Sequence, residues 1–161
     1  MEDLSAWFHA QLTSGAEAFT WAIGQIPEER LLLAPPNELG KWSATRHVFH
    51  LLSNERRLAL PNMRCWLGEL FEQDNNYQEE VEWAKGHDLA TLLTEFQRIR
   101  TEEIALLKQY QEEDWERFGV SPVWPDVSLR WVVTKTLQHT FEHTNNVLQM
   151  GLFWDFFGET N

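Results

Sequence analysis

Hydrophobic residues in this chain recur every three to four positions over long stretches, a spacing that places them on one face of an α-helix. Four such stretches predict helices, over Leu4–Gly24, from Ala44 onward, over Leu89–Glu112 and over Leu129–Phe157. Strand signals are weak, because the sequence lacks hairpin-type turns between alternating runs. The pattern predicts an all-α fold, and four long amphipathic helices indicate a four-helix bundle.

Residues that start or interrupt helices mark the boundaries of these stretches. Three of the helices follow a short polar residue that can accept a hydrogen bond from a free backbone N–H, namely Ser43, Asp88 and Ser128. Pro61 lies within the second stretch, where its ring and its missing N–H predict a bend, with helix resuming over Asn62–Leu70. The segment 25–42 is long enough to cross the bundle, so we expect a long crossover loop.

Composition and charge narrow the class of protein. The 161 residues suit a single domain, 1–161, and no apolar run approaches the ~20 residues of a membrane span. The formal net charge of −12 opposes binding to nucleic acid or to an anionic membrane, since both attract basic proteins. The opening residues lack a basic start and an apolar run, and Cys65 is the single cysteine. We therefore expect a cytoplasmic protein without an internal disulfide, with Cys65 in the core.

The last predicted helix contains the sequence HTFEH, in which His139 and His143 stand four residues apart. At about 100° per residue they lie about 40° apart, one turn above the other. The same face carries Val132 and Val147, so both imidazoles should point inward. Each can be a core histidine paired with a carboxylate or a carbonyl, but two at this spacing suit a shared metal ion. Because catalytic zinc sites commonly use three protein ligands, we expect another helix to supply the third.

The second helix offers two candidate ligands, His47 and His50. Helical rotation places His47 nearer the apolar stripe and His50 at its edge, so periodicity mildly favours His47. Glu55 projects among apolar residues of the same helix, where an unpaired carboxylate is costly to bury. It can form a buried pair with an arginine, or it can orient a ligand histidine and serve in catalysis. The sequence pattern alone does not decide between His47 and His50, or between the two roles of Glu55.

The segment KWSATRHVFHLLSNE resembles the second-helix signature of the DinB-like superfamily. Four residues match it in order and spacing, namely Trp42, Ser43, His50 and Glu55. In that family a His-x-x-x-His pair on the last helix completes the ligand set, so the resemblance implies a metal site of His50, His139 and His143. Three residues after the last ligand, where the family often has glutamine, this chain has Asn146, which we assign to substrate binding.

A competing motif overlaps the same pair of histidines. His139, Glu142 and His143 fit H-x-x-E-H, the signature of inverted zincin metalloproteases. Those enzymes take a further ligand from well downstream, whereas only 18 residues follow His143. Glu142 also lies about 60° from His139 around the helix. Both observations argue against a protease.

Three imidazoles leave a divalent ion with its charge and with open positions, which makes a Lewis-acid site suited to zinc, nickel or iron. The DinB-like superfamily includes S-transferases that use bacillithiol, mycothiol or glutathione, and metal coordination converts a thiol to its thiolate. The resemblance therefore implies a metal-dependent thiol S-transferase, with a small thiol and an electrophile as substrates. The alternatives are a metal-dependent hydrolase with Glu55 as base, or a non-enzymatic bundle that binds a metal or a small ligand.

Small thiols carry carboxylates, so positive side chains near the metal should anchor them. Arg46 and Arg57 lie within about 40° of His50 around the second helix, and Lys135 lies one turn before His139. Ordinary salt bridges are the alternative role for these cations. Exposed apolar surface would indicate a homodimer, and the residues that decide this are Trp124, Trp131 and Trp154.

Overall fold

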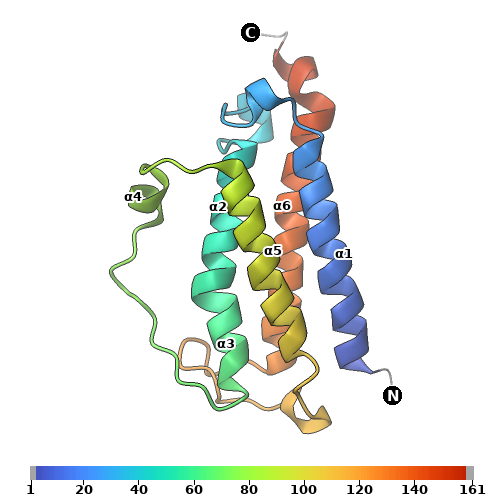
Figure 1. Ribbon diagram of the computed structural model, residues 1–161, viewed down its shortest axis with the longest axis vertical. Helices are drawn as coiled ribbons and strands as arrows, with labels where there is room; N and C mark the ends of the chain where they lie inside the picture. The colour runs from blue at the N-terminus through green and yellow to red at the C-terminus, as the bar shows by residue number, and fades with distance from the viewer. Residues whose placement is uncertain (1–2, 159–161) are drawn as a thin grey trace.

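The computed structural model describes residues 3–158, and the ends of the predicted domain, residues 1–2 and 159–161, lie outside the described residues. Four long helical rods run side by side (Figure 1). They are α1 (Leu4–Gly24), α2 (Ala44–Asn54) with its continuation α3 (Leu60–Cys65), α5 (Leu89–Leu106) and α6 (Leu129–Gly158). No strand occurs between residues 3 and 158, so the prediction of an all-α four-helix bundle is confirmed. None of the described helices is long and apolar enough to cross a membrane.

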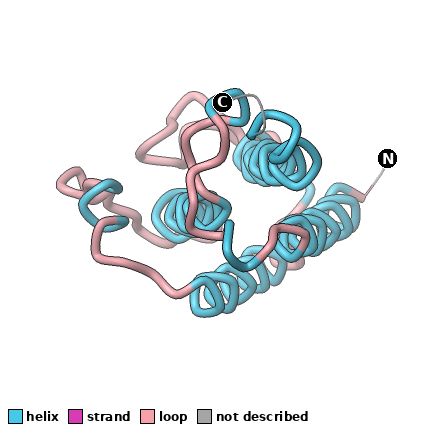
Figure 2. The backbone as a smooth tube through the Cα atoms, turned by 90° about the horizontal axis from the view of Figure 1, so that it is seen from above, coloured by secondary structure: helices cyan, strands magenta, loops and turns pink. Residues whose placement is uncertain are grey.

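The loop between α1 and α2 decides the order of the helices around the core. Both α1 and α2 pack against α5 and α6, which places α1 and α2 at opposite corners of the bundle. Residues 25–43 therefore cross one end of the bundle, as the length of this segment predicts. The connection contains two short 3-10 turns, η1 (Glu28–Arg30) and η2 (Asn37–Leu39). Figure 2 looks along the bundle and shows this loop passing over the helix ends.

Apolar side chains fill the space between the rods. Phe19 of α1 packs edge to face against Phe96 of α5, with ring centroids 5.4 Å apart. Gly15 of α1 packs against α6, where a β-carbon would make ordinary contacts, 3.5 Å from Phe141 and 3.6 Å from Leu137. The opposite face of α6 is thereby held toward α2, where the histidines lie.

The second rod passes Pro61 without a break. A π turn, η3 (Glu55–Ala59), joins α2 to α3, and the N–H of Leu60 donates to the carbonyl of Glu55. This wider turn accommodates Pro61, which has no N–H to donate to the carbonyl four residues earlier and whose ring would crowd that carbonyl. The side chain of Asn62 donates to the carbonyl of Leu58 at 2.7 Å, which satisfies one of the acceptors freed nearby. A π turn thus lies where the sequence predicts a bend.

Helix starts are predicted better than helix ends. The three predicted caps are confirmed by hydrogen bonds from Arg46 to Ser43 (3.2 Å), from Thr91 to Asp88 (2.8 Å) and from Trp131 to Ser128 (3.3 Å). The second rod ends at Cys65 instead of Leu70, because Gly68 takes a positive φ of 87° and closes the helix. The third predicted helix ends at Leu106 instead of Glu112, and Tyr110 beyond it donates to the carbonyl of Met63 at 2.9 Å.

A short helix, α4 (Glu79–Trp83), was not predicted from the sequence. It lies outside the four rods, on the long connection between α3 and α5 (Figure 1). Its contacts within the bundle are with α2.

The three tryptophans whose exposure would indicate a homodimer have different surroundings. Trp131 is 43% exposed, Trp124 is half-buried beside Trp131, and the half-buried ring of Trp154 is covered by the guanidinium of Arg30 at 5.2 Å. Such single exposed rings are common in monomers, so the homodimer stays a prediction.

Candidate metal centre

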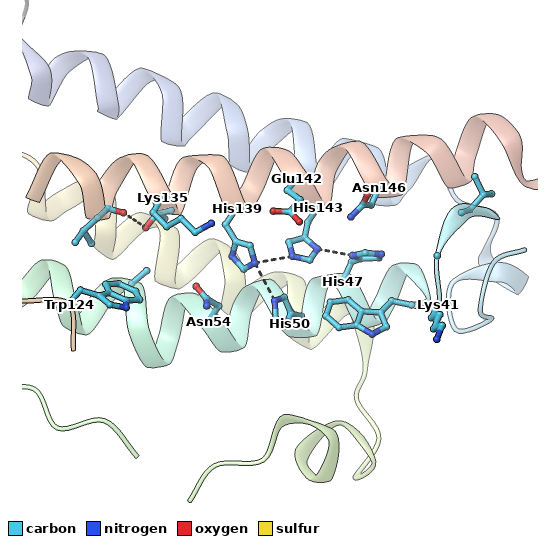
Figure 3. Close-up of a pocket in the computed structure, with 16 residues that line it drawn as sticks. Lys41, His47, His50, Asn54, Trp124, Lys135, His139, Glu142, His143 and Asn146 are labelled. Atoms are coloured by element: carbon cyan, nitrogen blue, oxygen red, sulfur yellow. Dashed lines mark hydrogen bonds between the residues drawn. The ribbon is translucent and has the colours of Figure 1, made fainter. Parts of the chain in front are cut away.

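Three histidines from two rods meet between α2 and α6 (Figure 3). The Nε2 atom of His139 lies 3.0 Å from Nε2 of His143 and 3.2 Å from Nε2 of His50. One ligand nitrogen from each of the three lies within 4.8 Å of the others. Nitrogens bound to one tetrahedral zinc ion at about 2.05 Å stand about 3.3 Å apart, so these spacings fit a single ion. The structure thus brings together His50, His139 and His143.

His47 joins the same cluster from the other side of His143. Its Nδ1 atom lies 2.7 Å from Nδ1 of His143, and its side chain is buried. A ring that binds a metal through Nε2 carries its hydrogen on Nδ1, and that hydrogen needs an acceptor. His47 is placed to be this acceptor, so both histidines of α2 reach the cluster but with different partners. Trp42 covers this part of the cluster, with its ring stacked on that of His143 at 6.1 Å.

Glu79 of α4 contacts the third histidine from outside the bundle. Its Oε1 atom lies 2.8 Å from Nδ1 of His50, and the same carboxylate accepts a hydrogen bond from Arg46 at 3.0 Å. A carboxylate only accepts, so Nδ1 of His50 carries the hydrogen and its Nε2 keeps a lone pair. Sequence reasoning missed this residue, because five helical residues show no readable period and nothing local links residue 79 to residue 50.

The imidazoles of His47, His139 and His143 are neutral near pH 7. Burial, and then the charge of neighbouring histidines, lowers the pKa of His47 to about 4 and the pKa of His143 to about 2. The same two causes lower the pKa of His139 to about 4. A neutral imidazole keeps a lone pair on one ring nitrogen, which can bind a cation placed between the three Nε2 atoms. The donor set therefore fits a divalent metal ion.

A cavity of about 530 Å³ opens beside the cluster. Among its lining residues are Lys41, Trp42, Asn54, Trp124, Lys135, Glu142 and Asn146. Figure 3 shows Lys135 and Trp124 toward one end of this cavity and Lys41 toward the other, with the histidines between them. The cavity is thus large enough for a small molecule, and the predicted substrate contacts Lys135 and Asn146 line it.

The structure places two other predicted substrate contacts elsewhere. Arg46 is buried and forms ion pairs with Glu79 at 3.0 Å and Glu80 at 2.7 Å. Arg57 stacks on the ring of Tyr77 at 3.3 Å and donates to the carbonyl of Asp74 at 3.1 Å. Neither lines the histidine cavity, because both are engaged by the long connection between α3 and α5.

Glu55, the predicted catalytic residue, lies away from the histidines. Its carboxylate is buried and forms an ion pair with Arg100 of α5. Within the described residues, no hydrogen bond or ion pair joins it to a histidine. Five residues separate it from His50, which turns it by about 140° around the helix, toward α5. The structure therefore corrects the orienting and catalytic roles and shows the buried arginine pair.

The single cysteine and the histidines outside the cluster have ordinary surroundings. Cys65 is buried, as predicted, and His9 is exposed. His87 hydrogen-bonds the carbonyl of Glu82 at 2.8 Å. Glu142 is exposed and accepts a hydrogen bond from Gln138 at 3.1 Å, and α2 supplies the third histidine where an inverted zincin would use a downstream ligand.

Comparisons with known proteins agree with the fold. YfiT from Bacillus subtilis, described as a probable metal-dependent hydrolase with an unusual four-helix bundle topology, superposes with a TM-score of 0.73. It is 17% identical in sequence, and the match covers 96% of this chain and 90% of that chain, which shows a shared fold. No curated protein matches the chain. The sequence profile of the DinB superfamily matches residues 11–147, a range that contains all three facing histidines. The chain therefore belongs to the DinB superfamily.

Proposed function

We propose that the protein binds one divalent metal ion through the Nε2 atoms of His50, His139 and His143 and is a metal-dependent enzyme. The convergence of these three nitrogens at the wall of a 530 Å³ cavity carries the proposal. Within the described residues, no fourth histidine, cysteine or carboxylate belongs to this group. A site with three protein ligands keeps a position for an exogenous molecule, which is the arrangement of catalytic rather than structural zinc.

Zinc, nickel and iron all suit imidazole ligands. A divalent ion held by these rings supplies a Lewis acid that lowers the pKa of a bound thiol or water. His47 and Glu79 keep the rings of His143 and His50 in the orientation in which Nε2 faces the ion. Trp42 covers one side of the cluster and limits the access of bulk water.

The reaction that we favour is transfer of a small thiol, such as bacillithiol, mycothiol or glutathione, to an electrophile. The carboxylates of such thiols require cations, and Lys41 and Lys135 line the cavity on opposite sides of the histidines. The ammonium of Lys135 also donates to Oε1 of Gln138 at 2.6 Å. Lys41 takes the anchoring role that the sequence analysis assigned to Arg46 and Arg57. Asn54 and Asn146 add amide groups, and Trp124 offers an apolar wall for the electrophile.

Hydrolysis is the second candidate, because one carboxylate lines the cavity. Glu142 is exposed there, and Gln138 orients it from one turn earlier on α6. It can take a proton from a water molecule in the cavity, a role that Glu55 cannot fill from its buried pair with Arg100. The description of YfiT as a probable hydrolase concerns that protein, and it makes the hydrolase assay worth including.

Metal analysis of the purified protein, followed by activity assays, tests the proposal. We expect one equivalent of metal in the wild type and in His9→Ala, whose histidine is exposed and outside the cavity, and little in His143→Ala. Thiol conjugation with the three thiols is then compared with ester and amide hydrolysis, before and after chelation. Metal binding without turnover indicates a binding protein, and equal metal contents in the wild type and His143→Ala refute the site.

A further inference from the structure

The short helix α4 lies outside the bundle yet contacts the candidate metal centre. We propose that Glu79 on α4 is a positioning residue for His50, and that Arg46 holds Glu79 in place. The inference rests on the proposed function, because it gives α4 a role in metal binding.

The hydrogen bond between Glu79 and His50 selects one form of the imidazole ring. A neutral imidazole has one N–H, and the 2.8 Å contact with a carboxylate places it on Nδ1. Nε2 then keeps its lone pair and points at Nε2 of His139, 3.2 Å away. Without Glu79, the ring is free to rotate or to place its hydrogen on Nε2, and either change removes the ligand atom.

Arg46 is the group that fixes Glu79 at this position. Its guanidinium binds Glu79 at 3.0 Å and Glu80 at 2.7 Å, and only 4% of its side chain is exposed. Three aromatic rings surround the cation at 5.1–5.2 Å, namely Trp42, Phe49 and Trp83. A helix of five residues has little stability of its own, so these contacts determine where α4 docks.

Metal binding and the docking of α4 are therefore coupled. The carboxylate of Glu79 binds the docking cation and the ligand histidine at the same time. If docked α4 favours the ligand form of His50, a bound ion must favour docked α4 by the same factor. Metal should then slow amide hydrogen exchange over residues 79–84, and this protection should be absent when Glu79 is replaced.

Glu79→Ala and Glu80→Ala form a matched pair that tests the proposal. Both remove a carboxylate from Arg46, but Glu80 has no contact with His50 and its side chain is 79% exposed. Competition with a chromophoric chelator should show zinc binding weakened about 10-fold to 100-fold by Glu79→Ala, and changed less than about 2-fold by Glu80→Ala. Glu79→Gln should lie between them, because its amide oxygen still accepts. Arg46→Lys should weaken zinc binding as well, since the lysine ammonium lies one bond short of the Nη2 atom that donates to both carboxylates.

Nitrogen-15 NMR of the histidine rings without metal gives a second readout. We expect hydrogen on Nδ1 of His50 in the wild type and in Glu80→Ala, and a mixture of both ring forms in Glu79→Ala. Equal zinc affinities of the two alanine variants, or an unchanged His50 ring in Glu79→Ala, would overturn the proposal. If the wild type binds no metal, the proposed function fails, and the ring spectra still decide whether Glu79 fixes His50.

Discussion

Replacing Arg100 by methionine should destabilise the bundle strongly, because this arginine balances two buried carboxylates. Its guanidinium pairs with Glu55 and lies 3.0 Å from Glu103, and at most 2% of each of the three side chains is exposed. It also donates to Thr140 at 2.8 Å and to the carbonyl of Leu12 at 3.2 Å. One cation thus links α1, α2, α5 and α6 next to the histidine cluster. Methionine keeps an unbranched apolar chain and removes only the charge and the hydrogen bonds.

Removing one partner of a buried ion pair costs about 3–5 kcal/mol, because the other charge stays buried and unpaired. Arg100→Met leaves two such carboxylates, so we expect a loss of about 4–5 kcal/mol at pH 8. Natural domains have a total stability of about 5–15 kcal/mol, so this variant should lie near the limit of folding.

The loss of stability caused by Arg100→Met should become smaller as the pH falls. Burial raises the pKa of Glu55, and burial together with the charge of Glu55 raises the pKa of Glu103 well above its usual value. An unfolded glutamate has a pKa of about 4.3, so the folded state binds extra protons above that pH. The contribution of these groups to stability is fully present below about pH 4.3 and is lost as the pH rises through the folded pKa. Without Arg100 the pKa values of Glu55 and Glu103 rise further, so lowering the pH should stabilise the variant more than the wild type.

Urea unfolding followed by circular dichroism at pH 5, 7 and 8 measures both effects in the metal-free protein. Arg98→Met is the control, because Arg98 lies on the same helix, pairs with Glu95 and Glu102, and is 51% exposed. Such surface pairs contribute about 1 kcal/mol or less. The reasoning is refuted if Arg100→Met and Arg98→Met cost the same at pH 8, or if the deficit of Arg100→Met grows at pH 5.

Three further outcomes are expected. His47→Ala should weaken zinc binding about 10-fold in chelator competition, because Nδ1 of His143 loses its acceptor, and wild-type affinity in this variant would contradict that role. The pKa values of His139 and His143 are lowered to about 4 and about 2, so these two rings should lose no protons when zinc binds above about pH 5. Calorimetry in buffers of different ionisation enthalpy can check this. Gly15→Ala should raise the free energy of unfolding by up to about 1 kcal/mol, because the new methyl group lies 3.5 Å or more from Phe141; a lower urea midpoint would refute this.

Features of the fold that depend on neighbouring residues follow from the sequence, and those that depend on distant contacts do not. A cap needs only one side chain and the next turn, so Ser43, Asp88 and Ser128 were identified correctly. The π turn before Pro61 was not identified, because a kink, a break and a π turn all relieve the same clash. The position of α4 depends on its contact with Arg46, more than 30 residues earlier in the chain, and no local pattern records that contact.

The choice between His47 and His50 shows why periodicity does not identify a candidate metal ligand by itself. Helical rotation favours the residue nearest the apolar stripe, and the structure does bury His47, whereas His50 is half-buried. His50 lies at the edge of the stripe, and it lines the cavity there. At that edge, His50 meets His139 through Nε2 and is still reached by Glu79 from outside the bundle. The deeper position suits the opposite task, because His47 can bind the far nitrogen of His143 only from within the core. Burial alone does not separate a candidate ligand from the residue that supports one, because His143 is as buried as His47. The motif shared with the DinB superfamily supplied the distinction that the helical wheel lacked.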